Sequence, residues 1–206
     1  MQTPDRRPLA SRSSRWAQAA AAALARSSVT PNQISLASIV FALVSAFALV
    51  RANPGMLLVA AVCVQLRLLC NLLDGMVAIE GGKQSAVGAL YNEFPDRIAD
   101  SLLLIALGFA AGAPWLGWLA ALLAALTAYV RATGGALGLA QDFRGPMAKP
   151  HRMAVLTIAC VAGAAELAWF GSRYALTVAA ILIAAGSAVT CVTRTLAIAK
   201  LLRERP

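Results

Sequence analysis

Two neighbouring apolar segments carry acidic and amide side chains at helical spacing. Asn71 and Asp74 lie three residues apart in the first segment. Asn92, Asp96 and Asp100 follow one another at intervals of four in the second. Residues at these intervals share one face of an α-helix, and ionisable groups in an apolar helix indicate a functional site. Because Mg²⁺, Mn²⁺ and Ca²⁺ prefer carboxylate and carbonyl oxygens, the spacing predicts a site for a divalent cation.

The composition places these segments in a membrane. The chain has 206 residues, of which 60% are hydrophobic and 13% are charged, and its mean hydropathy is +0.72. Soluble domains carry about 25% charged residues, so we expect an all-α integral membrane protein. Six transmembrane helices are predicted, over residues 33–50, 56–79, 87–112, 115–139, 153–170 and 174–198.

The chain is expected to have two parts. Residues 1–30 form a polar amino terminus and a juxtamembrane segment, in which residues 14–27 are predicted to be an amphipathic surface helix anchored by Trp16 and its basic ends. Residues 31–206 form the six-helix membrane domain. Pro31 suits the first position of the first membrane helix.

Basic residues are distributed unevenly between the two ends of the predicted spans. The formal net charge is +9, and the cations gather near both termini and between residues 141 and 152, whereas the opposite loops hold little beyond Arg51 and Arg173. The positive-inside rule therefore predicts that the acidic cluster faces the cytoplasm, as it would in a bacterial inner membrane. Since the cations flank spans, anionic lipid head groups are the expected partners and nucleic acid is not.

The acidic cluster resembles the signature of the CDP-alcohol phosphotransferase family, also called CDP-alcohol phosphatidyltransferases. That signature reads D-x-x-D-G-x-x-A-R, then eight residues, then G-x-x-x-D-x-x-x-D. This chain has Asp74, Gly75 and Ala78 in the first part and Gly88 and Asp96 in the second, at the same spacing. The resemblance covers nearly the whole chain, and the motif is long and rigidly spaced.

The resemblance implies an enzyme of phospholipid biosynthesis. Its members transfer a phosphatidyl or related group from a CDP-linked lipid, usually CDP-diacylglycerol, to an alcohol acceptor, and they release CMP. They hold two divalent metals among their aspartates and usually form homodimers. For this chain the resemblance implies one or two Mg²⁺ or Mn²⁺ ions, with five candidate ligands: Asn71, Asp74, Asn92, Asp96 and Asp100.

Further roles follow from the same resemblance. Asp96, as the last aspartate of the motif, is expected to take the proton from the attacking hydroxyl. The CMP part of the donor is expected near Gly75, Ala78 and Gly88. Cations outside the motif are expected to hold substrate phosphate, and the candidates are Arg67, Arg131, Lys149 and Arg152.

Three residues depart from the family pattern. Asn71 and Asn92 stand where the family has aspartate, and Ile79 stands where it has arginine. Each asparagine keeps a carbonyl ligand but loses a charge, so two metal ions are less well compensated. The nearby acids that are candidates to supply the missing charge are Asp100, Glu80 and Glu93.

Alternative interpretations exist for the residues and for the whole protein. The acids are alternatively partners of buried arginines, the asparagines alternatively form interhelical hydrogen bonds, and the cations near residue 150 alternatively reflect topology alone. The two asparagines also motivate a non-catalytic protein that binds CDP-lipid or a lipid head group. A channel or transporter is disfavoured, because the acids cluster near one membrane face.

Overall fold

The computed structural model describes residues 14–205, apart from the side chains of residues 80 and 89. This part of the chain contains seven α-helices and no strand. The helices are α1 (Arg15–Arg26), α2 (Pro31–Arg51), α3 (Pro54–Glu80), α4 (Gly88–Ala110), α5 (Pro114–Ala136), α6 (Lys149–Phe170) and α7 (Tyr174–Arg203). The all-α prediction is confirmed, and the polar segment over residues 1–13 lies outside the described residues.

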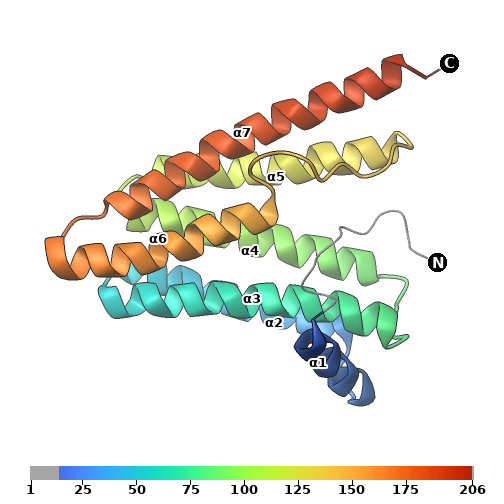
Figure 1. The fold of residues 1–206 in the computed structure, drawn as a ribbon, viewed down its shortest axis with the longest axis horizontal. Coiled ribbons are helices and arrows are strands. Elements are labelled where there is room, and N and C mark those ends of the chain that lie inside the picture. The colour runs from blue at the N-terminus through green and yellow to red at the C-terminus, as the bar shows by residue number, and fades with distance from the viewer. Residues whose placement is uncertain (1–13, 206) are drawn as a thin grey trace.

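The six long helices form a closed ring. Helix α2 packs against α3 and α4, α3 packs against α6, α6 against α7, α7 against α5, and α5 against α4. Helix α1 lies across the end of this bundle and packs on α3 (Figure 1). The alternating direction of the helices brings the last turns of α3, α5 and α7 and the first turns of α2, α4 and α6 to the same end as α1. We call this the α1 end of the bundle.

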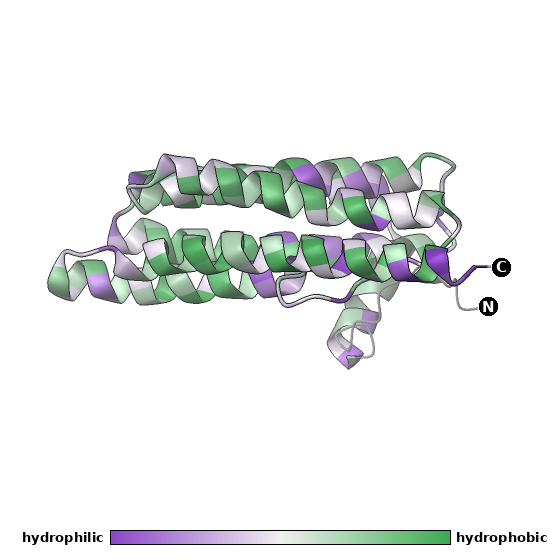
Figure 2. Cartoon of the chain, turned by 90° about the horizontal axis from the view of Figure 1, so that it is seen from above, coloured by the Kyte–Doolittle hydropathy of each residue, from purple (hydrophilic) through white to green (hydrophobic). Residues whose placement is uncertain are grey.

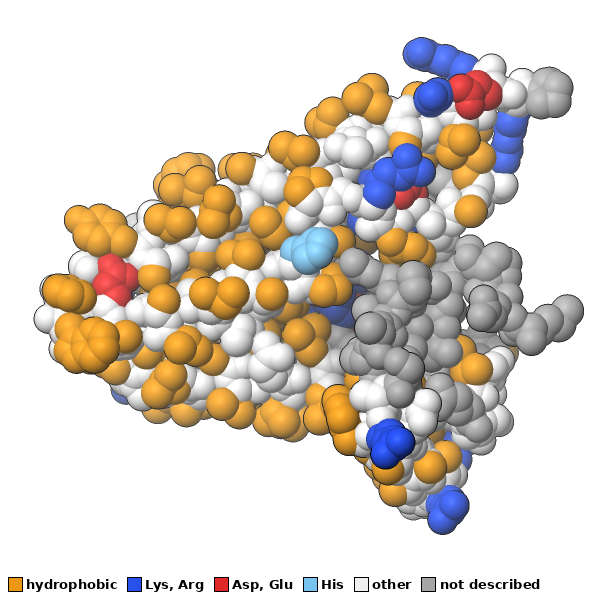
Figure 3. Space-filling view, in the orientation of Figure 1, with side chains coloured by type: hydrophobic (Ala, Val, Ile, Leu, Met, Phe, Trp, Pro, Cys, Tyr) orange, Lys and Arg blue, Asp and Glu red, His pale blue; other side chains and the backbone are white. Residues whose placement is uncertain are grey.

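The helices have the length and apolarity of membrane spans. Five of them, α2, α3, α5, α6 and α7, are long and apolar enough to cross a bilayer. Helix α4 is also long enough, with 23 residues, but it carries four charged residues, Glu93, Asp96, Arg97 and Asp100. Polar segments of the helices gather in the half that contains the α1 end (Figure 2), and lysines and arginines are concentrated there on the surface (Figure 3). The protein is therefore an all-α integral membrane protein whose polar groups lie toward one end.

Local sequence signals explain where α2 and α3 begin. Thr30 and Gln33 form a capping box, in which the Thr30 hydroxyl accepts from the Gln33 amide N–H and the Gln33 side chain accepts from the Thr30 N–H. The Asn53 side chain accepts from the Met56 N–H at 2.9 Å, directly before a proline in the first turn of α3. These caps set the register that carries Asn71 and Asp74 toward the α1 end.

Helices α6 and α7 are longer at the α1 end than the sequence predicted. Helix α6 begins at Lys149 instead of residue 153, and α7 extends to Arg203 instead of residue 198. Pro150 fits this start, because a proline is accommodated in the first turn of a helix, where N–H groups lack intrahelical partners. Lys149 and Arg152 therefore belong to the first turn of α6 and not to a loop.

Helices α4 and α5 approach each other closely through two glycines. A Cβ atom at Gly108 would lie 2.6 Å from the Cα of Gly117, and one at Gly117 would lie 2.8 Å from the carbonyl oxygen of Leu104. Both contacts are shorter than real Cβ atoms show, so any side chain would push the two helices apart. Small residues at helix crossings are typical of membrane bundles.

We expect Gly117→Ala to lower the free energy of unfolding by about 1–3 kcal/mol, the usual cost of overpacking. Gly55→Ala is the matched control, because the nearest atom to its Cβ would be 3.7 Å away. Thermal unfolding of the purified protein in detergent measures both. Equal midpoints for the two variants would show that the α4–α5 contact tolerates a methyl group.

Candidate active site

A cavity of about 780 Å³ opens between the helices at the α1 end. Its walls include residues from α2, α3, α4, α5, α6 and α7, so the whole ring contributes to it. Ten of the residues predicted from the sequence line it: Asn71, Asp74, Gly75, Ala78, Gly88, Asn92, Asp96, Arg131, Lys149 and Arg152. The fold thus brings both halves of the signature and three of the four predicted phosphate-binding cations to one place.

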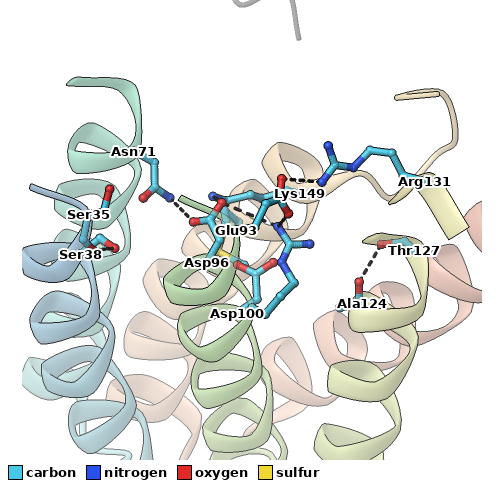
Figure 4. A network of polar contacts seen from close by, with 12 residues as sticks. Ser35, Ser38, Asn71, Glu93, Asp96, Asp100, Ala124, Thr127, Arg131 and Lys149 are labelled. Atoms are coloured by element: carbon cyan, nitrogen blue, oxygen red, sulfur yellow. Dashed lines mark hydrogen bonds and ion pairs between the residues drawn. The ribbon is translucent and has the colours of Figure 1, made fainter. Parts of the chain in front are cut away.

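Asp96 is the most connected residue of the cavity wall. Its Oδ2 atom lies 2.5 Å from the Lys149 ammonium nitrogen, and its Oδ1 atom accepts from the Asn71 side-chain amide at 2.8 Å. The Arg67 guanidinium also lies 3.3 Å from Oδ1. Figure 4 shows Asn71 and Lys149 converging on this carboxylate from different helices. Asp96 therefore links α3, α4 and α6 at the floor of the cavity.

Asp100 and Arg67 lie beneath the cavity and do not line it. One carboxylate oxygen of Asp100 lies 2.7 Å from Arg67, and the other lies 3.0 Å from Arg152. The side chains of Arg67 and Asp100 are only 0% and 4% exposed. The sequence predicted Asp100 as a metal ligand and Arg67 as a phosphate binder, but this arrangement gives each a buried ionic partner. Their placement favours the alternative that Asp100 is the partner of buried arginines.

Asp74 occupies a separate part of the wall. It is 4% exposed, and the hydroxyl of Ser35 in α2 donates to its Oδ2 atom at 2.6 Å. The hydroxyl of Ser38 donates to the Ser35 backbone oxygen at 2.6 Å (Figure 4). Asp74 is thus oriented by a hydrogen bond from a neighbouring helix, as carboxylates that bind metal commonly are.

The acids proposed to restore the lost charge are placed differently. Glu93 lines the cavity, but its carboxylate lies 2.7 Å from the Arg131 guanidinium. Arg131 also donates to Gln141 and stacks over Phe143, with 5.4 Å between the guanidinium carbon and the ring centroid. The side chain of Glu80 lies outside the described residues. Asn92 lines the cavity and is exposed.

Three cavity residues were missed by sequence reasoning. Ser35 was a neutral residue in an apolar helix, and only its contact with Asp74 reveals a role. Arg194 is 4% exposed in α7 and donates to backbone oxygens of Arg144 and Thr127 at 2.8 Å, and its depth within an apolar helix was the available signal. Lys83 donates to the backbone oxygens of Ser27 and Val29 beyond α1, and its Gly-rich loop offered no signal.

The donor atoms of the cavity suit a hard divalent cation. Carboxylate and amide oxygens are available from Asp74, Asp96, Asn71 and Asn92, which is the ligand chemistry of Mg²⁺ and Mn²⁺. Within residues 14–205, no group of three or more histidine, cysteine or acidic side chains could hold a metal by itself. A cation here would therefore rely on the amide oxygens as well as the two carboxylates.

Comparison with known proteins identifies the family of the chain. The sequence profile of the CDP-alcohol phosphatidyltransferase family matches residues 28–192. A phosphatidylinositol phosphate synthase of Mycolicibacterium smegmatis is 31% identical over 182 residues, which are 84% of this chain and 79% of that protein.

Solved structures share the fold. A Mycobacterium tuberculosis phosphatidylinositol phosphate synthase with CDP-DAG bound has a TM-score of 0.72 and 24% identity, over 90% of this chain and 94% of that one. The same protein in complex with manganese and citrate has a TM-score of 0.71 and 24% identity, over 88% of each chain.

A membrane bundle with an acidic and basic cavity at one end defines a membrane enzyme that acts on phosphate-bearing substrates. The chain belongs to the CDP-alcohol phosphatidyltransferase family. It is a transferase of phospholipid biosynthesis, which moves a substituted phosphate from a CDP-linked lipid to an alcohol and releases CMP. The family and the activity predicted from the sequence are confirmed.

Proposed function

We propose that this chain transfers the phosphatidyl group of CDP-diacylglycerol to the hydroxyl of an inositol phosphate, with Mg²⁺ or Mn²⁺. The observation that carries the proposal is the meeting of the signature acids from α3 and α4 with basic residues from α5, α6 and α7 in one cavity. The relatives named phosphatidylinositol phosphate synthases, and the CDP-DAG and manganese bound in the M. tuberculosis structures, support the donor, the acceptor and the metal.

The charge of the cavity wall supports an acceptor that itself carries phosphate. Three acidic residues line the wall, namely Asp74, Glu93 and Asp96. Six basic residues line it, namely Lys83, Arg97, Arg131, Lys149, Arg152 and Arg194. Because the basic residues outnumber the acidic ones, the wall favours dianionic groups in addition to the donor pyrophosphate. We assign acceptor phosphate to Arg131, Lys149 and Arg152.

The signature residues take the remaining roles. Asn71, Asp74, Asn92 and Asp96 would hold the divalent ion, which supplies charge neutralisation to the pyrophosphate when bound. Gly75, Ala78 and Gly88 leave room for CMP, because their side chains are small or absent. Asp96 takes the proton of the acceptor hydroxyl as its oxygen bonds to the phosphatidyl phosphorus and the bond to CMP breaks. Arg67 and Asp100 hold Asp96 and Arg152 in place.

We also propose an orientation of the chain in the membrane and a division of the chain into two parts. The excess of basic residues at the α1 end supports a cytoplasmic position for this end, and for the cavity, in a bacterial inner membrane. We assign residues 31–206 to the catalytic membrane domain and residues 1–30 to the juxtamembrane segment, of which the described helix α1 packs on α3. The expected homodimer stays a prediction.

The test is CMP release by the full chain in lipid nanodiscs with CDP-diacylglycerol and Mg²⁺ or Mn²⁺. We expect release with inositol phosphate and little with inositol, which lacks only the phosphate. Equal release with both would overturn the phosphate-bearing acceptor, and release with another alcohol alone would replace it. Binding of CDP-diacylglycerol without release for any acceptor would instead support the non-catalytic lipid-binding protein that the two asparagines suggest.

The hydrogen bond from Ser35 to Asp74 leads to a prediction about metal affinity. We expect Ser35→Ala to weaken Mn²⁺ binding by about 10-fold to 100-fold, because partners of ligating carboxylates typically contribute this much. Ser38→Ala is the matched control, since its hydroxyl contacts a backbone oxygen and not Asp74. Titration with Mn²⁺, followed by the electron paramagnetic resonance signal of the free ion, compares the two. Equal weakening would assign both serines to packing.

A further inference from the structure

A divalent ion needs negative ligands to offset its charge, and this cavity has few of them. Asn71 and Asn92 offer carbonyl oxygens without charge. Glu93 lies 2.7 Å from Arg131, so its charge is already balanced. The signature positions themselves supply two acids to the described cavity wall, Asp74 and Asp96.

Three cations among the described residues lie near the Asp96 carboxylate: Lys149 from α6, Arg67 from α3 at 3.3 Å and Arg97 from α4 itself at 3.7 Å. Lys149 is the first residue of α6, its side chain is 20% exposed, and its ammonium nitrogen lies 2.5 Å from Oδ2 of Asp96. On the other oxygen, the Asn71 amide donates at 2.8 Å, where an aspartate would repel (Figure 4). The Asp96 carboxylate thus has an amide at position 71, where the family has an acid, and a lysine ammonium on its other oxygen.

Charge balance decides how many divalent ions this arrangement accepts. Two such ions would bring twice the charge of the two carboxylates into a cavity that six basic residues already line. One divalent ion beside Asp74, with one ammonium beside Asp96, requires much less compensation. Uncompensated charges in a partly buried site are costly, so the second arrangement is favoured.

We propose that the site binds a single divalent ion and that the Lys149 ammonium takes the place of a second ion beside Asp96. This inference rests on the proposed function, because it concerns the same catalytic site. It makes Lys149 a charge-supplying residue of the metal site as well as a neighbour of the substrate phosphate.

The experiment counts Mn²⁺ ions per chain in nanodiscs, by equilibrium dialysis and by the resonance signal of free Mn²⁺. The wild type should bind one ion. Lys149→Met should bind Mn²⁺ at least about tenfold more tightly, since a like charge is removed. Lys200→Met is the matched control and should bind as the wild type does, because Lys200 is exposed, pairs with Glu204 and does not line the cavity. The combined variant Asn71→Asp, Asn92→Asp, Lys149→Met should bind two ions with a spin-coupled spectrum.

The outcomes separate this inference from the proposed function. Two ions on an active wild type would overturn the inference alone, as would a folded Lys149→Met protein with unchanged Mn²⁺ affinity. One ion without CMP release would keep the inference and overturn the transferase, and no ion without CMP release would overturn both. Where the combined variant does not fold, judged by gel filtration, the wild-type count and Lys149→Met decide the question.

Discussion

Asp96→Asn is expected to lower metal-dependent CMP release by about 10²-fold to 10⁴-fold, the usual contribution of a positioned general base. The substitution keeps the shape of the side chain but removes its charge. Lys149, at 2.5 Å, then loses its anionic partner at the cavity floor, and Arg67 keeps only Asp100. An amide also cannot accept the proton of the acceptor hydroxyl. The assay is CMP release with saturating CDP-diacylglycerol, inositol phosphate and Mn²⁺.

The matched control is Asp142→Asn in the segment between α5 and α6. Asp142 pairs with Arg144 at 2.8 Å and does not line the cavity, so its substitution should leave CMP release unchanged. Arg67 still has Asp100 as a partner in the Asp96 variant, so we expect that variant to fold. CMP release at the wild-type rate by a folded Asp96→Asn protein would remove Asp96 from the mechanism.

Asp100→Ala is expected to lower the free energy of unfolding by about 3–5 kcal/mol, the cost of removing one partner of a buried ion pair. Asp100 is the shared anion of Arg67 and Arg152, which belong to α3 and α6. Without it, two almost fully buried guanidinium groups lack their shared counter-charge, and only Asp96 still links α4 to α3 and α6 by ion pairs. Thermal unfolding in detergent micelles, together with gel filtration, measures the effect.

The same residue distinguishes a structural role from metal binding. Asp100→Asn keeps the volume and one acceptor oxygen, so it should destabilise less than Asp100→Ala. If Asp100 is structural, the Mn²⁺ affinity of the folded Asn variant should stay close to that of the wild type. A strong loss of Mn²⁺ affinity with unchanged thermal stability would instead restore Asp100 as a metal ligand.

Much of the architecture follows from local sequence. Apolar runs of membrane length predicted the six long helices, and short segments such as the one around Asn53 and Pro54 separated them. The predicted boundaries differ from the observed ones by a few residues. The end of α7 lies five residues beyond the predicted one, and α6 begins four residues before residue 153, where Pro150 suits a first helical turn. The amphipathic helix predicted over 14–27 is observed as α1.

The acidic motif was likewise visible before the fold, because i+3 and i+4 spacing places side chains on one helix face whatever surrounds the helix. The sequence by itself therefore determined the membrane class, the helices and the acidic motif with its family. It could not determine which charged side chains form ion pairs between helices. Lys149 meets Asp96, and Arg152 meets Asp100, over separations of 53 and 52 residues.

Those ion pairs depend on how the helices pack in the ring. A cation on α6 reaches an acid on α4 only when the two side chains lie at the same height along the bundle. The tertiary structure alone thus decided that Asp100 and Arg67 lie beneath the cavity while Asp96 lines it. The physical reason is that helical periodicity specifies a face and a height along one helix. The partner of a charge depends on which neighbouring helix covers that face, and packing decides this.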